Sequence, residues 1–245
     1  MNQDDQSEHF SPPTEDNASD DGEAPQLTVP FEDPTKEFFT GLFETIKLVI
    51  FQPTHFFKNY KMDGPIGRPL LFAVMIGWTT AIISAIWGSI INKSIFAYIQ
   101  EHMPEIEGVD WEKFAAGSGS GDFIWTLILA PIFILFGIFI IAGIYHLFLM
   151  IIKGANKNFE TTFNVVSYGM TARIAEVIPF CGNVIAWIFG MVLAIIGLAE
   201  AHKTDNGKAA FAVLVPVLLC CLCIFILFMM IGASGVAAYL NKSLQ

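Results

Sequence analysis

Long uncharged apolar runs dominate the chain after residue 68 and predict its fold. Three long runs and two shorter ones cover residues 69–91, 123–152, 161–179, 183–201 and 209–240, and the two shorter runs flank the tight sequence PFCGN. About 20 apolar residues in an α-helix cross the ~30 Å hydrocarbon core of a bilayer. The pattern therefore predicts an all-α fold, a polytopic membrane helix bundle with five transmembrane helices over residues 69–240.

Residues 33–68 show a helical period instead of a continuous apolar run. Large apolar residues recur from Phe38 to Ile50 at spacings of three and four, and most lysines and glutamates lie off that stripe. Asp33 and Pro34 suit the start of a helix, and Pro53 suits its end. We expect an amphipathic, juxtamembrane helix that lies on the bilayer surface, with packing against the protein's own bundle as the alternative.

Residues 1–32 differ in composition from the rest of the chain. They are rich in Asp, Glu, Ser and Pro, and no Lys or Arg occurs between Asp4 and Asp33. Such a segment cannot bury enough apolar surface to offset its ordering entropy, so we expect a disordered acidic cytoplasmic tail. This tail accounts for the net charge of -10, which gives no indication of a nucleic-acid partner. It also lacks the apolar core of a secretory signal peptide.

Composition and the distribution of basic residues predict the location and orientation. Hydrophobic residues make up 54% of the chain and charged residues 15%, against about 25% charged residues in soluble domains. Nine Lys and Arg residues fall on the side of the N-terminus and three on the other. The N-terminus is therefore predicted to be cytoplasmic and the C-terminus extracytoplasmic. If residues 161–179 were re-entrant, four spans would remain and the C-terminus would be cytoplasmic.

Two charges, Arg173 and Glu176, interrupt the apolar run 161–179. Three residues apart on a helix, they are neighbours, and charges inside a membrane segment are costly and often functional. A helical projection gathers Asn164 and Tyr168 on one side and gives a stripe that can face lipid: Phe163, Val166, Met170, Ile174 and Val177. Three interpretations stay open for the pair: a structural pair near the outer interface, a polar pocket shared with other helices, or a proton or ion pathway.

His146 completes this candidate intramembrane polar site, about 10 Å beneath the cytoplasmic boundary. No second His, Cys or acidic residue stands at ligand spacing on its own helix, which favours a hydrogen-bonded packing role over a metal site or a proton relay. Pro179, Gly182 and Gly197 are expected at the turn and at helix contacts, where small residues permit close approach.

Catalytic motifs are absent from the sequence. HExxH, P-loop and GxGxxG patterns do not occur, and Cys220 and Cys223 share CxxC spacing but have no partners for a zinc site. The GASG sequence at 232–235 is similar to the serine motif of rhomboid proteases, yet no His follows it. We expect no enzyme activity, no cofactor and no metal.

Several segments, in their order along the chain, resemble the prokaryotic branch of the Yip1 domain family. They are QPTHFF (52–57), GPIGRPLLF (64–72), HLFLMIIKGANKNFETTFNVVSY (146–168), IPFCG (178–182), GLAEAH (197–202) and GKAAFAVLVPVLL (207–219). The resemblance extends from about residue 36 to 240. It implies a five-span membrane protein with a cytoplasmic N-terminus, here in the bacterial cytoplasmic (inner) membrane.

Eukaryotic members of that family act in vesicle trafficking, bind Rab-type small GTPases and one another, and influence membrane shape. Their cytoplasmic Asp-Leu-Tyr-Gly-Pro element survives here only as Asp63, Gly64 and Pro65. A small GTPase is therefore a partner by analogy alone. The first hypothesis is a non-enzymatic scaffold or membrane-organising protein that contacts lipid and a membrane-protein partner or a second copy. The alternative is a transporter, a channel or an accessory subunit that uses the polar face of residues 161–179.

Overall fold

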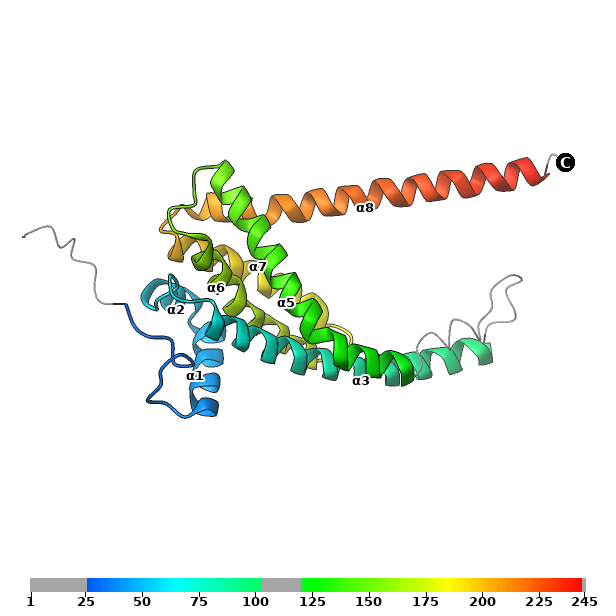
Figure 1. The fold of residues 1–245 in the computed structure, drawn as a ribbon. Coiled ribbons are helices and arrows are strands. Elements are labelled where there is room, and N and C mark those ends of the chain that lie inside the picture. Colours follow the sequence, from blue (N-terminus) through cyan, green and yellow to red (C-terminus); the bar gives the residue numbers. More distant parts are fainter. Residues whose placement is uncertain (1–25, 103–119, 244–245) are drawn as a thin grey trace, which may run out of the picture.

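A computed structural model describes residues 26–102 and 120–243, and those residues are almost entirely helical (Figure 1). The elements are α1 (Phe38–Phe51), α2 (Pro53–Asn59), α3 (Gly67–His102), α5 (Ser120–Ile151), α6 (Phe159–Gly169), the 3₁₀ helix η1 (Met170–Val177), α7 (Gly182–Ala201) and α8 (Asn206–Ser243). Most of the predicted tail, residues 1–25, and residues 103–119, which lie between the first two predicted spans, are outside the described residues.

Among the described residues, four helices are long and apolar enough to cross a membrane. Their apolar portions are Gly67–Ile91 of α3, Leu127–Ile151 of α5, Gly182–Ala201 of α7 and Asn206–Gly232 of α8. They agree with four of the five predicted runs, and the all-helical, multi-pass membrane fold is confirmed to that extent.

The remaining predicted run, 161–179, is built differently. It consists of the short α6 followed by the 3₁₀ helix η1, and every residue from Thr161 to Tyr168 is buried between the other helices. The expected lipid-facing stripe is therefore wrong for Phe163 and Val166, which pack in a core cluster with residues of α3 and α5. Hydrophobicity alone did not distinguish a stripe that faces lipid from one that faces neighbouring helices.

The helices meet at two distinct ends of the molecule (Figure 1). We call one the capped end: residues 26–66, the α5–α6 connection (152–158) and the α7–α8 connection (202–205) gather there. At the opposite, open end, Trp87 of α3 donates from Nε1 to the carbonyl of Val177, 3.1 Å away, beside the η1–α7 turn. The segment α6–η1 thus runs from one end to the other between α5 and α7.

The folded part of the chain begins before the boundary predicted at residue 33. Leu27 pairs with the backbone of residues 59–61, and Val29 and Phe31 are buried in the main core. The amide of Phe31 also donates to Thr45 Oγ1 of α1, 3.0 Å away. Residues 26–32 are therefore part of the fold rather than of a tail, because Val29 and Phe31 are buried in the main core and the backbone of Leu27 is paired.

Helix α1 presents two apolar faces. One face, which includes Gly41, Leu42, Thr45 and Val49, is buried. At 100° per residue, Phe39, Phe43, Ile46 and Ile50 form a neighbouring stripe, and Phe39 and Phe43 are strongly exposed. The two alternatives for this helix are thus compatible: one face packs on the bundle while the second is free for a bilayer.

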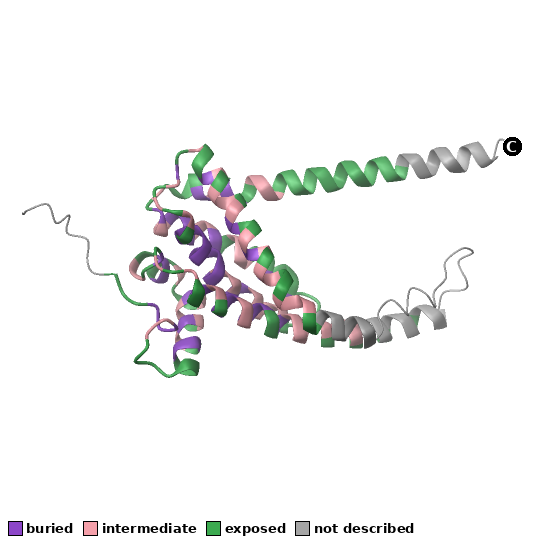
Figure 2. Ribbon diagram, in the orientation of Figure 1, coloured by how far each residue is buried: buried purple, intermediate pink, exposed green. Residues whose placement is uncertain are grey.

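Two of the predicted contact glycines occupy places where a side chain does not fit. A Cβ on Gly182 would lie 2.3 Å from the carbonyl oxygen of Ala175, and one on Gly197 would lie 2.5 Å from Cγ1 of Val165. Pro179 starts the tight turn in which Phe180 takes the left-handed conformation, with φ of 67°. Buried residues concentrate around α6 and its neighbours, whereas α8 is exposed along most of its described length (Figure 2).

Candidate functional site

The structure divides the five residues of the predicted polar site between two places. His146, Asn164 and Tyr168 belong to the half of the molecule next to the capped end, and each is hydrogen-bonded to a residue that is distant in sequence. Arg173 and Glu176 lie on η1 and line a separate cavity near the open end. The five residues therefore do not form one site.

A buried hydrogen-bonded chain joins His146 to a second histidine. Thr162 Oγ1 of α6 lies 2.8 Å from His146 Nδ1 of α5 and 2.8 Å from Nε2 of His202, directly after α7. The amide of Lys157 donates to Nδ1 of His202, 3.2 Å away. His202 Nδ1 is thus an acceptor, so Nε2 carries the proton and donates to Thr162, whose hydroxyl donates to His146.

His202 is held neutral by its surroundings. Its side chain is fully buried, and this desolvation, with smaller contributions from His146 and Lys157, lowers the pKa of His202 from 6.5 to about 4. A second proton, on Nδ1, would also face the amide N–H of Lys157 that now donates to that nitrogen. The chain therefore favours one protonation state at neutral pH and fixes α5, α6 and α7 relative to one another.

Asn164 and Tyr168 attach the segments that precede α3 to the buried helix α6. Asn164 Nδ2 donates to the carbonyls of Met62 and Gly64, at 2.8 and 3.0 Å, which fixes the loop that carries Asp63. The hydroxyl of Tyr168 donates to Glu32. Burial raises the pKa of Glu32, while the bond to Tyr168 and the charges of Arg68 and Lys61 oppose that shift. Two polar residues of α6 thus determine where residues 26–66 lie.

Hydrogen bonds from side chains join the α5–α6 connection to the α7–α8 connection and to the start of α8. Lys153 and Lys203 adopt left-handed conformations after α5 and α7, with φ of 53° and 50°. The carbonyl oxygen of Lys153, after α5, accepts a hydrogen bond from Lys208 Nζ of α8 at 3.0 Å. The carbonyl oxygen of Lys203, after α7, accepts one from Asn156 Nδ2 of the α5–α6 connection at 3.3 Å. The carbonyls that close these helix ends are therefore satisfied by side chains as well as by the backbone.

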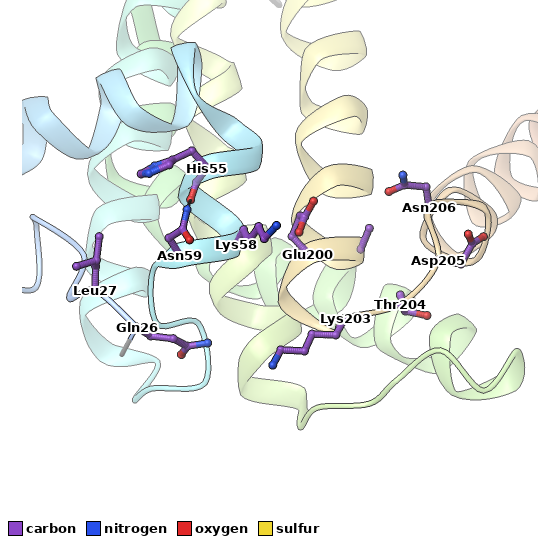
Figure 3. A pocket seen from close by; sticks show the side chains of 11 residues that line it. Gln26, Leu27, His55, Lys58, Asn59, Glu200, Lys203, Thr204, Asp205 and Asn206 are labelled. Atoms are coloured by element: carbon purple, nitrogen blue, oxygen red, sulfur yellow. Dashed lines mark hydrogen bonds between the residues drawn. The ribbon is translucent and has the colours of Figure 1, made fainter. Parts of the chain in front are cut away.

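A polar recess of about 900 Å³ opens at the capped end, between α2 and the end of α7 (Figure 3). Residues Gln26 and Leu27 form part of its wall, together with His55, Lys58 and Asn59 of α2 and Glu200 of α7, and with Lys203, Thr204, Asp205 and Asn206 of the connection and the start of α8. Lys58 points across the recess toward Glu200, so charges of both signs line it (Figure 3). This recess therefore offers polar and charged groups to a partner.

Arg173 and Glu176 form an ion pair at the edge of a different cavity. Arg173 Nη2 lies 3.0 Å from Glu176 Oε2, and Ser84 Oγ of α3 lies 3.4 Å from the same oxygen. The Glu176 side chain is 10% exposed and that of Arg173 36%. They line a mostly apolar cavity of about 510 Å³ between α5, α6–η1, α7 and α8. The pair thus borders a cavity shared with other helices, and the three interpretations of its role stay predictions.

Buried polar atoms without a partner concentrate on one segment. Within the described residues, the fully buried side-chain atoms that lack a hydrogen bond are Thr161 Oγ1, Asn164 Oδ1, Ser167 Oγ and Arg173 Nε. All four belong to α6–η1. Such atoms are costly to bury, and a cluster of them marks a place where water or a ligand is expected.

Sequence analysis missed His202, Thr162 and Glu32. His202 stands in the quoted segment GLAEAH, but the search for a partner of His146 considered only its own helix. The described residues contain no group of three His, Cys, Asp or Glu side chains arranged to hold a metal ion. The two histidines thus act with a threonine, in a hydrogen-bonded chain.

Comparisons with known proteins give one match. The model of the Yip1 domain matches residues 47–228. No curated protein and no solved structure matches the chain. The matched range contains the apolar segments of α3, α5 and α7 and most of that of α8, together with the histidine chain and the Arg173–Glu176 pair. Because the match covers well over half of the sequence, it confirms the resemblance found in the segments, and this chain belongs to the Yip1 domain family.

Proposed function

We propose that this protein is a non-enzymatic membrane scaffold that binds a membrane-protein partner, or a second copy of itself, at the capped end. The observation that carries the proposal is the recess of about 900 Å³ between α2 and the end of α7. Its walls are held by the His202 chain and the reciprocal lysine contacts, so the surface is pre-formed. Pre-formed concave surfaces lose little conformational entropy when a partner binds.

The proposal includes five membrane crossings with a cytoplasmic N-terminus in the bacterial cytoplasmic membrane. Helix α6 and η1 together extend about 32 Å, from 11 residues at 1.5 Å and eight at 2.0 Å. That length is comparable with a ~30 Å hydrocarbon core. Because α5 ends at the capped end and α7 begins at the open end, the segment between them must cross the same distance. The exposed stripe of α1 then lies on the cytoplasmic surface of the bilayer.

Cysteine labelling tests this topology. Cys181 is exposed in the η1–α7 turn, so a variant that keeps Cys181 and replaces the other three cysteines should react with a membrane-impermeant maleimide from outside intact cells. Asn206→Cys, in a background without the native cysteines, should react only after permeabilisation. Labelling of Cys181 only after permeabilisation, as four crossings require, or of both positions from the same side would contradict five crossings.

Photo-crosslinking tests the scaffold function. A benzoylphenylalanine at His55 or Asn206, on opposite walls of the recess, should give a protein adduct of defined mass in native membranes. The same group at Ile140 of α5, which is exposed toward lipid, is the matched control. Co-expression of a differently tagged copy identifies self-association. Lys58→Glu should reduce the adduct at both recess positions, and crosslinking to lipid alone at all three positions would contradict the proposal.

A transporter, a channel or an accessory subunit of a transport complex is the second candidate function. Four unpartnered polar atoms on α6–η1 favour it, since they line the segment that joins the two ends of the molecule. Reconstituted protein should then move a solute or an ion, and Glu176→Gln should abolish the flux. Under the scaffold proposal no flux is expected from either protein.

A further inference from the structure

The cavity at the open end combines an apolar interior with a charged rim. Its volume of about 510 Å³ falls within the roughly 300–1,000 Å³ of small-molecule sites. Ile141 and Ile144 of α5, Met191 of α7 and Val217 of α8 contribute to its apolar lining. Arg173, Glu176 and Asn183 supply the polar groups. A ligand that fits both parts needs an apolar chain and a polar head.

The rim carries two charges that are only partly used within the protein. Arg173 Nε is buried and has no hydrogen-bond partner among the described residues, although Nη2 pairs with Glu176. Both contacts of the Glu176 carboxylate fall on Oε2, which leaves Oε1 without a donor in the described part of the chain. A cation and an anion, side by side and each with capacity to spare, complement a head group that has one charge of each sign.

Aromatic residues place this rim at the level of lipid head groups. Trp187 lines the cavity and is exposed, and Trp87 donates to the Val177 carbonyl just beyond Glu176. Tryptophan is enriched where the hydrocarbon core meets the head groups. A phospholipid of the leaflet next to the open end therefore has its charged head and its acyl chains at the depths of the rim and of the cavity.

We propose that this cavity binds one zwitterionic phospholipid that carries a primary amine. The phosphate lies against Arg173, the ammonium group against Glu176, and an acyl chain fills the space between α5, α7 and α8. An anionic phospholipid offers the same phosphate but no cation, and Glu176 repels it. This site is independent of the scaffold proposal, because it needs only that the chain lies in a membrane.

Gly169 and Gly190 leave room in the cavity for the acyl chain of the lipid. Cβ atoms added at Gly169 and Gly190 would meet nothing closer than 3.6 Å, the distance from Gly190 to Cβ of Ala172. Gly190→Leu on α7 therefore fills part of the cavity without a clash at Cβ. Gly143→Leu on α5 is the matched control, because a Cβ there meets nothing within 4 Å and its helical neighbours Ile140 and Leu147 are exposed.

Native mass spectrometry of the protein from mixed micelles tests the proposal. With phosphatidylethanolamine, phosphatidylglycerol and diacylglycerol at equal concentrations, the wild type and Gly143→Leu should retain phosphatidylethanolamine with about a tenfold preference, the value of one charge-assisted hydrogen bond. Gly190→Leu should lose this bound lipid. Equal retention by Gly190→Leu, or retention of diacylglycerol at the same level as phosphatidylethanolamine, would overturn the site.

Glu176→Gln tests the head group separately from the cavity. Without the carboxylate, the ammonium group loses its partner and the phosphate of phosphatidylglycerol is no longer repelled. The preference for phosphatidylethanolamine should therefore fall to about equality while the total amount of bound phospholipid is kept. If the preference for phosphatidylethanolamine over phosphatidylglycerol is unchanged, the ion pair does not determine which head group binds. Size-exclusion profiles that match the wild type confirm that each variant is folded.

Discussion

The capped end and the open end of this protein are stabilised in different ways. At the capped end, hydrogen bonds between residues far apart in sequence join α5, α6, α7 and residues 26–66, and most fully buried side chains lie close to that network. Beyond its first turns at the capped end, α8 diverges from the bundle (Figure 1), and its apolar segment is only 11% buried. The capped end is held mainly by contacts within the protein, although Thr161 Oγ1, Asn164 Oδ1 and Ser167 Oγ of α6 lack a partner among the described residues. The exposed apolar part of α8 depends on lipid or on a partner.

This difference follows from the surroundings of each region, which are water at the capped end and lipid tails within the hydrocarbon core. Next to water, helix ends need partners for their carbonyls and amides, and the capped end supplies them from side chains. Within the hydrocarbon core, lipid tails are as apolar as leucine, so a helix gains little by burying its surface against another helix. In this chain, the polar surface of the capped end is therefore fixed by internal contacts, whereas most of the surface of α8 is left to its surroundings.

The largest expected effect is the loss of the histidine at the centre of the capped end. His202→Leu leaves the Lys157 amide without an acceptor and removes the donor to the Thr162 hydroxyl, which keeps only its bond to His146, and each loss costs about 1–3 kcal/mol. We expect unfolding free energy to fall by about 2–5 kcal/mol, measured by steric trapping or denaturation in micelles. His146→Leu, which removes the outer acceptor alone, should cost about 1–3 kcal/mol. Equal costs for the two variants would contradict the central role of His202.

The same residue should make stability depend on pH. The folded-state pKa of His202 is about 4 against 6.5 in the unfolded chain, so the unfolded state binds the proton more readily. Stability is then fully present above pH 6.5 and falls as the pH decreases from 6.5 toward 4. Glu32 acts in the opposite direction, because its raised pKa favours the folded state as the pH falls. The measurement is therefore the difference in melting temperature between the wild type and His202→Leu at each pH, which should shrink in this window.

Much of the fold was predictable, because apolar runs of adequate length have few alternatives in a membrane. The polar contacts were not. Glu32 finds Tyr168 across 136 positions in sequence, and His202 finds Thr162 across 40. Spacing along one helix contains no information about such pairs, since they depend on how separate helices pack. The 3₁₀ geometry of η1 was also missed, because a projection at 100° per residue assumes an α-helix.

For Arg173 and Glu176, the sequence predicted one feature of the site, their contact, but not another, the cavity beside them. Their spacing of three predicted their contact, and the structure has it at 3.0 Å. The cavity beside them is formed by α5, α7 and α8 as well, so the run 161–179 offered a shared pocket only as one of three interpretations and did not indicate the mostly apolar lining. Their functional role stays a prediction.

Paired glycine substitutions compare packing in the two regions. Gly197→Ala places a Cβ 2.5 Å from Val165 Cγ1 and 3.2 Å from the ring of Phe57, so we expect a loss of about 1–3 kcal/mol from overpacking. Gly190→Ala meets only Ala172, at 3.6 Å, and should be neutral or stabilise α7 by up to about 1 kcal/mol. Thermal unfolding in one detergent measures the stability of both variants. If Gly197→Ala is as stable as Gly190→Ala, the helices are packed no more tightly at Gly197 than at Gly190.

The smallest expected effect is the coupling between Arg173 and Glu176. A double-mutant cycle with Arg173→Gln and Glu176→Gln should give about 0.5–1 kcal/mol in detergent, because the pair is partly exposed at the rim. If the pair only anchors the hairpin of η1 and α7, added lipid leaves that coupling unchanged. If the pair holds a head group, phosphatidylethanolamine changes it, since each charge then has a second partner, whereas diacylglycerol does not. The coupling measured with these two lipids therefore separates a fixed structural contact from one completed by the membrane.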